Sequence, residues 1–143
     1  MPKILAVDDN DFNLEPLKVL VGHLFKIRID LAFDGEQALE MFRETFNKPC
    51  KCENRSYKFI FMDLQMPNMD GFEASEKIIK IMADAKQEDY CHIVALTSYT
   101  SDEVRDRVLN IGLKALINKP LHANDLQRMV YIHFYRMPVQ EFE

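Results

Sequence analysis

The feature that most constrains the fold is a repeating order, in which a short apolar run is followed by a longer stretch with helical spacing. Ile4–Val7, Phe59–Met62, Ile93–Leu96 and Ala115–Ile117 are wholly apolar, and Ile27–Leu31 alternates apolar with charged residues. Wholly apolar runs of this length are typical of strands that are buried on both faces. Because strands and helical patterns alternate, the sequence predicts a parallel sheet with helices on both faces.

The spacing of apolar residues, together with caps and breakers, predicts a helix after each expected strand. These helices are expected near residues 11–25, 36–46, 72–82, 104–111 and 123–135. Pro16 requires the first helix to start near Asp11–Asn13, because proline is tolerated only near a helix start. Asp34 is a predicted cap of the second helix, and Gly112 is expected to end the fourth.

The chain of 143 residues is long enough for one domain with a core of its own. We expect a single domain over residues 1–143, with its core near 2–135, an enlarged loop at 47–58 and a tail at 136–143. A hydrophobic fraction of 48% with 29% charged residues excludes a disordered chain. The 18 basic and 23 acidic residues give a net charge of −5, which argues against direct nucleic-acid binding.

No apolar run reaches the ~20 residues that a membrane span needs, and no signal peptide is visible. Three cysteines without a secretory signal indicate reduced thiols and a cytoplasmic location. Two of them, Cys50 and Cys52, lie in the expected loop, and a zinc site there would lack further ligands. The aromatic C-terminal segment, Tyr131 to Phe142, is expected to pack partly on the core, with an edge cover or dimer contact as the alternative.

Polar residues collect directly after the buried runs: Asp8 and Asp9, then Asp63, Thr97 and Lys119. A parallel sheet brings these positions to one edge, where ligands bind in such folds. Each carboxylate pair at ~4 Å would repel by about 4 kcal/mol at an effective dielectric near 20, so the cluster calls for a cation. Oxygen ligands without His or Cys favour Mg²⁺. A hydroxyl and an ammonium nearby would complete a phosphate site, in which one carboxylate forms an aspartyl phosphate.

Four segments resemble the receiver domain of two-component response regulators, in order and in spacing. They are Val7–Asn10, Phe61–Gly71, Ala95–Ser98 and Lys119–Pro120. The run MDLQMPNMDG within the second segment is highly specific. The opening Asp-Asp-Asn-x-x-Asn is most similar to receivers of hybrid histidine kinases. The resemblance covers nearly the whole chain and implies a flavodoxin-like (βα)5 fold with a doubly wound, five-stranded parallel sheet of order 2-1-3-4-5.

The resemblance also implies a role for each matched residue of the acidic site. Asp63 would be the phosphoacceptor. Asp8, Asp9 and Asp63 would hold Mg²⁺, together with the backbone carbonyl of Gln65. Thr97 would donate a hydrogen bond to the phosphoryl group.

Lys119 would neutralise the phosphoryl group, and the resemblance implies a cis Lys119–Pro120 bond that aims the ammonium into the site. Phosphorylation would then switch a surface formed by the fourth helix, fifth strand and fifth helix. The family often carries an aromatic switch residue where this chain has Leu116, and a leucine cannot form the hydrogen bond of such a switch. Tyr99, two residues after Thr97, is expected either to screen the site from water or to be a surface aromatic.

The implied phosphoryl donor is a phosphohistidine, on a histidine kinase or a histidine phosphotransfer protein. The expected docking surface lies around the first helix and the loop after the fifth strand, and comprises Phe12, Pro16, Val19, Leu20, Pro120 and Leu121. The switching surface is also the expected contact of a homodimer. Such a chain catalyses its own phosphorylation and a slow loss of the phosphoryl group, and is not a turnover enzyme.

Two other function classes stay open at this point. One is a phosphatase of the haloacid-dehalogenase type, because Asp9-Asn10-Asp11 provides its Asp-x-Asp opening. That family needs an acidic pair after the lysine, but only Asp125 follows Lys119 within the expected core near residues 2–135. The other is a protein-interaction module on the same fold that is never phosphorylated, which would leave the acidic site without a role.

Overall fold

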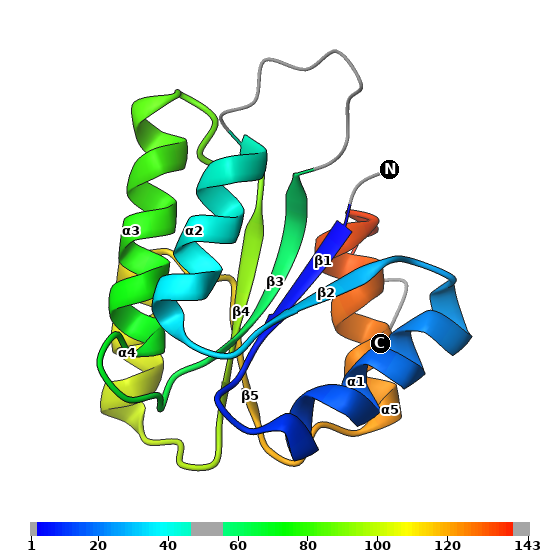
Figure 1. The fold of residues 1–143 in the computed structure, drawn as a ribbon. Helices are drawn as coiled ribbons and strands as arrows, with labels where there is room; N and C mark the ends of the chain where they lie inside the picture. Colours follow the sequence, from blue (N-terminus) through cyan, green and yellow to red (C-terminus); the bar gives the residue numbers. More distant parts are fainter. Residues whose placement is uncertain (1–2, 47–55, 139–143) are drawn as a thin grey trace.

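A computed structural model describes residues 3–46 and 56–138 of the chain. Five parallel strands form one sheet of order β2-β1-β3-β4-β5, as expected (Figure 1). The strands are β1 (Lys3–Val7), β2 (Ile29–Ala32), β3 (Tyr57–Asp63), β4 (His92–Thr97) and β5 (Ala115–Asn118). The break in strand order lies between β1 and β3, so the carboxyl ends of these two strands flank the crevice where such folds bind ligands.

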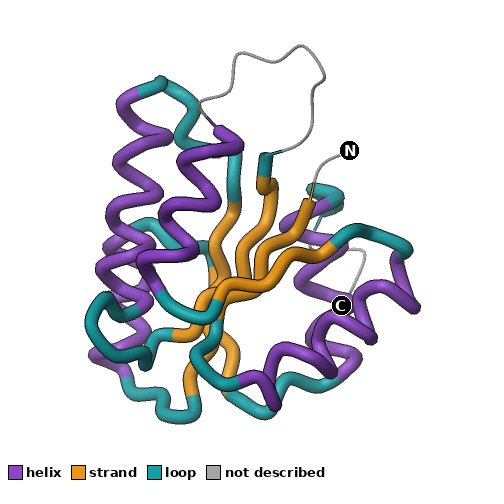
Figure 2. The backbone as a smooth tube through the Cα atoms, in the orientation of Figure 1, coloured by secondary structure: helices purple, strands orange, loops and turns teal. Residues whose placement is uncertain are grey.

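Helices cover both faces of the sheet, with α2, α3 and α4 on one side and α1 and α5 on the other (Figures 1 and 2). The helices are α1 (Asp11–Phe25), α2 (Gly35–Phe46), α3 (Gly71–Asp84), α4 (Asp102–Ile111) and α5 (Ala123–Met129). The chain continues from α5 into a π-helix, η1 (Val130–Phe134). In the described part of the chain, no helix is long and apolar enough to cross a membrane.

The wholly apolar strands are explained by two separate buried clusters, one on each face of the sheet. Leu5 and Ile60 belong to the cluster under α2, α3 and α4, whereas their neighbours Ile4 and Phe61 belong to the cluster under α1 and α5. All four side chains are fully buried. Because successive side chains of a strand point to opposite faces, a strand between two cores must be apolar at every position.

Two expected boundaries were wrong. The polar loop expected up to Lys58 ends earlier, because β3 begins at Tyr57. The Tyr57 side chain is buried and its hydroxyl donates a hydrogen bond to Asp30 Oδ2 at 2.6 Å, which provides a polar partner inside the sheet. The last helix is not one α-helix up to Tyr135, since regular helix ends at Met129 and the π-helix follows. The expected loop residues 47–55, with Cys50 and Cys52, lie outside the described residues.

Candidate functional site

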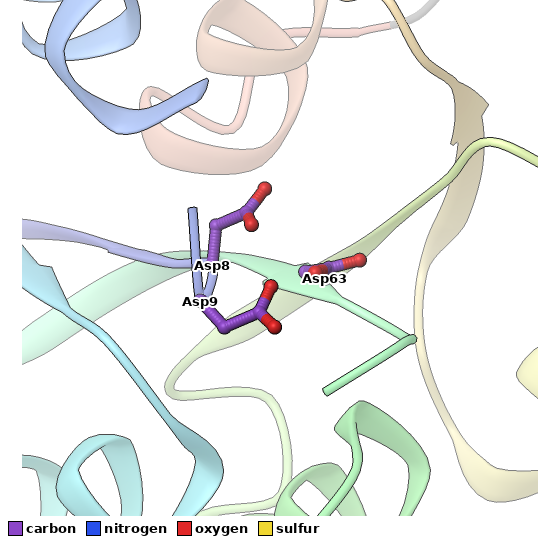
Figure 3. Close-up of side chains that lie close together, drawn as sticks. All are labelled: Asp8, Asp9 and Asp63. Carbon is purple, nitrogen blue, oxygen red and sulfur yellow. The ribbon is translucent and has the colours of Figure 1, made fainter. Parts of the chain in front are cut away.

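Three aspartates lie together beyond the carboxyl ends of β1 and β3. Asp8 and Asp9 follow β1, and Asp63 is the last residue of β3. One carboxylate oxygen of each lies within 4.8 Å of one oxygen of each of the others (Figure 3). Asp8 and Asp63 are buried with 2% exposure each, whereas Asp9 is open to solvent. The three residues that the sequence analysis assigned to a metal site therefore form a single cluster.

Lys119 inserts its ammonium between two of these carboxylates. Its Nζ lies 2.7 Å from Asp8 Oδ2 and 3.2 Å from Asp63 Oδ1. The lysine follows β5, and its backbone N–H donates to the carbonyl of Thr97 at 2.8 Å, which fixes the loop to the end of β4. The Lys119–Pro120 bond is cis, as the resemblance implied. One cation thus offsets part of the charge of the buried pair of carboxylates.

The protonation of Asp63 is strongly perturbed. Burial, and then the negative charge of Asp8, raise the pKa of Asp63 to about 6. The hydrogen bond from the Gln65 backbone N–H and the Lys119 ammonium act in the opposite direction and lower this pKa. For Lys119, burial favours the neutral form, but the hydrogen bond to Asp8 and the charges of Asp63 and Asp8 outweigh it and raise the pKa. Burial and the charge of Asp8 therefore disfavour the ionised form of Asp63, and an added cation would favour it.

Thr97 is buried at the end of β4, and its hydroxyl contacts the backbone of the nearby residue Tyr99. It donates to the backbone oxygen of Tyr99 at 3.0 Å and accepts from the Tyr99 N–H at 3.1 Å. On the open side of the site, the Ser98 hydroxyl donates to Gln65 Oε1 at 3.3 Å. The Gln65 N–H donates to Asp63 Oδ1 at 3.2 Å, so the loop after β3 holds the aspartate.

Leu116 and Tyr99 differ in burial. Leu116 is half-buried and packs against the core cluster under α2, α3 and α4. Tyr99 has 65% of its surface exposed and lines an open pocket together with Gln65 and Thr97. In this conformation Tyr99 is a surface aromatic beside the site, which favours the second of the two interpretations of its role.

An apolar cleft of about 230 Å³ opens beside the acidic site, between α1 and the loop after β5. Five residues of the expected docking surface line this cleft: Phe12, Pro16, Leu20, Pro120 and Leu121. Asp8 and Lys119 also line it, which connects it with the acidic site. Val19 does not line the cleft, although it is exposed on α1.

Two residues that support the site, Gly71 and Asn13, could not be recognised as supports from the sequence. A Cβ atom at Gly71 would collide with the backbone oxygen of Asp63, so the start of α3 can approach the end of β3 only at a glycine. Asn13 donates its side-chain amide to Asp8 Oδ2 at 3.1 Å. Both residues belong to motifs that the sequence analysis quoted, but the motifs do not reveal the contacts with Asp63 and Asp8.

A parallel five-stranded sheet of this order, with carboxylates, a threonine and a lysine at one edge, defines a doubly wound domain whose ligand crevice lies at that edge. The model of the response regulator receiver domain matches residues 4–131. The chain therefore belongs to the response regulator receiver domain family.

Curated relatives agree with this assignment. The chain is 30% identical over 128 residues to the osmosensing histidine protein kinase SLN1 of Saccharomyces cerevisiae, which is 90% of this chain and 10% of that protein. It is 32% identical over 131 residues to histidine protein kinase 1 of Candida albicans, again 90% of this chain but 5% of the relative. The chain thus spans a tenth or less of the length of these two relatives.

Solved structures show the same fold. The receiver domain of the Saccharomyces cerevisiae response regulator Ssk1, crystallised with the histidine phosphotransfer protein Ypd1, matches with a TM-score of 0.78 and 25% identity. That match covers 92% of this chain and 88% of the other. The receiver domain of the Arabidopsis thaliana histidine kinase CKI1, complexed with Mg²⁺ and BeF₃⁻, matches with a TM-score of 0.76 and 24% identity. It covers 90% of this chain and 89% of the other.

Proposed function

We propose that this receiver domain accepts a phosphoryl group on Asp63 from a phosphohistidine and changes its signalling surface in response. The observation that carries the proposal is the position of Asp63, a buried carboxylate beside Asp8 and within 3.2 Å of Lys119. We also propose that residues 1–143 form a single domain and that this domain lies in the cytoplasm. The donor is a histidine kinase or a histidine phosphotransfer protein.

The donor set fits Mg²⁺, because it consists of hard oxygen atoms from three carboxylates that lie close enough to share one ion. Asp9, Asp8 and Asp63 would hold the ion together with the backbone carbonyl of Gln65. When bound, the ion would offset the charge that builds up between the carboxylates and the phosphoryl oxygens.

Transfer is an in-line displacement at phosphorus. An Oδ atom of Asp63 forms a new bond to phosphorus while the bond between phosphorus and the donor imidazole nitrogen breaks. The electron pair of the broken bond stays on that nitrogen, which leaves as neutral imidazole after proton uptake. Lys119 stays beside Asp63 and neutralises charge on the transferred group, so this chain contributes mainly position and charge.

Thr97 connects the phosphoryl group to the rest of the domain. Its hydroxyl has one proton, which it donates to the Tyr99 carbonyl in the unphosphorylated structure. To donate to a phosphoryl oxygen, the hydroxyl must give up that bond and release the connection between β4 and α4. We propose that this release changes the surface of α4, β5 and α5, including Leu116, and that the same surface forms a homodimer contact.

The cleft beside α1 is the proposed contact with the donor protein. Phe12 lines the cleft and is 87% exposed, and Lys119 and Asp8 line the same cleft. An exposed apolar patch next to a charged site is typical of a protein-binding surface. A donor that covers the patch would bring its phosphohistidine to the open side of Asp63. Val19 would contribute at the margin of the contact.

Labelling with a small acyl phosphate tests the proposal. The protein is incubated with Mg²⁺ and acetyl phosphate, and its intact mass is measured. We expect one added phosphoryl group in the wild type and none in Asp63→Asn. A label that persists in Asp63→Asn and disappears in Asp9→Asn would instead indicate the phosphatase-like chemistry. A wild-type protein that is labelled neither by acetyl phosphate nor by a phosphohistidine protein would indicate an interaction module.

A further inference from the structure

Asn13 contacts the acidic site but takes no part in the proposed transfer. It is the third residue of α1, and its Nδ2 donates to Asp8 Oδ2 at 3.1 Å. The same oxygen accepts from Lys119 Nζ at 2.7 Å. One carboxylate oxygen therefore receives a neutral amide and an ammonium, from opposite ends of the sequence.

The start of α1 shows why this position carries a donor. In the common capping arrangement, a Glu or Gln at the third helical position accepts the backbone N–H of the N-cap residue. The N-cap of α1 is Asn10, and its backbone N–H instead donates to Asp8 Oδ1 at 3.0 Å. Asp8 thus takes the place of the usual acceptor, and the third residue of the helix faces a carboxylate.

The chemistry of the third helical position follows from that exchange. At the start of α3, where the cap is Asp70, the third residue is the acidic Glu73. A glutamate at position 13 would bring a further negative charge to a cluster that already holds three. An asparagine carries no charge and can offer N–H to Asp8. The identity of residue 13 is therefore explained by Asp8 rather than by the helix.

The contact has a consequence for the rest of the site. Asp8 is held by three donors: the Asn10 backbone, the Asn13 amide and the Lys119 ammonium. The amide of Asn13 is the only side-chain donor that α1 contributes to Asp8 among the described contacts. Without it, the carboxylate could rotate and carry its bond to Lys119 away from Asp63.

We propose that Asn13 is a positioning residue of this site. It fixes the Asp8 carboxylate in the orientation that serves Mg²⁺ and that keeps Lys119 beside Asp63. The proposal rests on the proposed function, since it assigns to Asn13 an indirect part in the same site. Asn13 acts through Asp8 and does not itself touch the phosphoryl group.

A different role has to be separated from this one, because Asn13 also lines the apolar cleft beside Phe12. A residue that only contacts the donor protein would affect transfer from that protein and leave Mg²⁺ binding unchanged. A residue that only supports the helix would lower the melting temperature and affect the site no more than any other lost cap. Mg²⁺ affinity of the unphosphorylated protein separates the positioning role from the other two, and the melting temperature and the rate of transfer from a donor protein separate those two from each other.

The test uses two variants at position 13 and one matched control. Asn13→Leu keeps the approximate size and removes the donor, whereas Asn13→Gln restores an amide. Asp34→Ala is the control, because Asp34 Oδ1 accepts the Gln37 N–H at 2.6 Å and so caps α2 without contacting Asp8. Calorimetry gives the Mg²⁺ dissociation constant of each unphosphorylated protein, thermal unfolding gives its melting temperature, and acetyl phosphate gives its labelling rate.

For Asn13→Leu we expect a rise of about tenfold in the Mg²⁺ dissociation constant, as is usual when a residue that orients a metal ligand is lost. Labelling at subsaturating Mg²⁺ should slow in proportion. Asn13→Gln should recover at least part of the affinity. Asp34→Ala should lower the melting temperature by about as much as Asn13→Leu does. Its Mg²⁺ affinity should nevertheless stay within about twofold of the wild type.

Two results would overturn the assignment. One is an unchanged Mg²⁺ affinity in Asn13→Leu with a loss confined to transfer from a phosphohistidine protein, which would make Asn13 a docking residue. The other is an equal loss of affinity in Asp34→Ala, which would make the effect one of stability. A wild-type protein that binds Mg²⁺ but is never labelled would refute the proposed function, and the effect of Asn13→Leu on Mg²⁺ affinity would still decide the role of Asn13.

Discussion

The buried histidine of the C-terminal π-helix leads to a prediction about acid stability. His133 is 9% exposed, and its Nδ1 lies 3.1 Å from Nδ1 of His92 at the start of β4. The other ring nitrogen of His92, Nε2, is paired with Asp89 at 2.8 Å. In this contact one Nδ1 can carry a proton and donate it to the other. If both Nδ1 atoms carried a proton, two N–H groups would face each other and neither could accept.

Several groups act on His133 in the same direction. Burial, followed by the charges of His92, Arg136 and Lys114, lowers the pKa of His133 to about 4, and only Asp89 opposes the shift. The unfolded chain therefore binds a proton near pH 6.5, whereas the folded chain does so only near pH 4. The stabilisation is complete above about pH 6.5 and is lost as the pH falls toward 4.

The magnitude follows from the same two values. The full shift would remove about 2 kcal/mol of unfolding free energy between pH 8 and pH 5. Since water reaches part of the surroundings of the ring and screens the charges, we expect 1–2 kcal/mol. Asp63 acts in the opposite direction, because burial and then the charge of Asp8 raise its pKa to about 6 and acid therefore stabilises the fold through it. Only a comparison of variants isolates the histidine.

Urea unfolding at pH 8, 6.5 and 5 supplies that comparison. His133→Asn keeps an amide near the position of Nδ1 and cannot titrate in this range. Its stability deficit relative to the wild type should shrink by 1–2 kcal/mol between pH 8 and pH 5. His23→Asn, at an exposed position on α1, is the control for the loss of an imidazole outside this pair. A deficit in His133→Asn that stays constant over this range would refute the reasoning.

Three further predictions concern the site and its supports. Gly71→Ala should lower the free energy of unfolding by about 1–3 kcal/mol, because the added Cβ meets the backbone at Asp63. It should also slow labelling at least tenfold, and unchanged labelling would contradict the close approach. Tyr57→Phe should cost about 1–2 kcal/mol in urea unfolding, since Asp30 would lose its 2.6 Å hydrogen bond. Chelation of divalent cations with EDTA should stop labelling by acetyl phosphate and excess Mg²⁺ should restore it, whereas labelling that continues in EDTA would exclude the proposed use of the ion.

The sequence was sufficient to predict the sheet, because burial on both faces leaves a clear signature. Ile4 and Leu5 are both apolar although they point to opposite sides, and only a sheet between two helical layers requires that. The end of the last helix could not be predicted in the same way. The apolar spacing continues after Met129, so it gives no signal for the π-helix, in which Tyr131 and His133 pack against Phe25 of α1 and Phe59 of β3.

The site was predictable as far as its residues follow strands. Asp8, Asp63 and Lys119 come directly after or at the end of strands, so the parallel arrangement brings them together. The contacts around them were not predictable. The amide of Asn13 reaches Asp8 because of a rotamer at the first turn of α1, and the hydroxyl of Thr97 turns to its own chain, which no spacing reveals.

The most direct test of the account is the position of the label within the chain. Protein labelled by a phosphohistidine donor in the presence of Mg²⁺ is reduced with borohydride, which converts a phosphorylated aspartate into homoserine, and its peptides are sequenced by mass spectrometry. The account predicts homoserine at residue 63 and at no other aspartate. Modification at residue 8 or 9, or a stable label on a histidine with residue 63 unchanged, would contradict it.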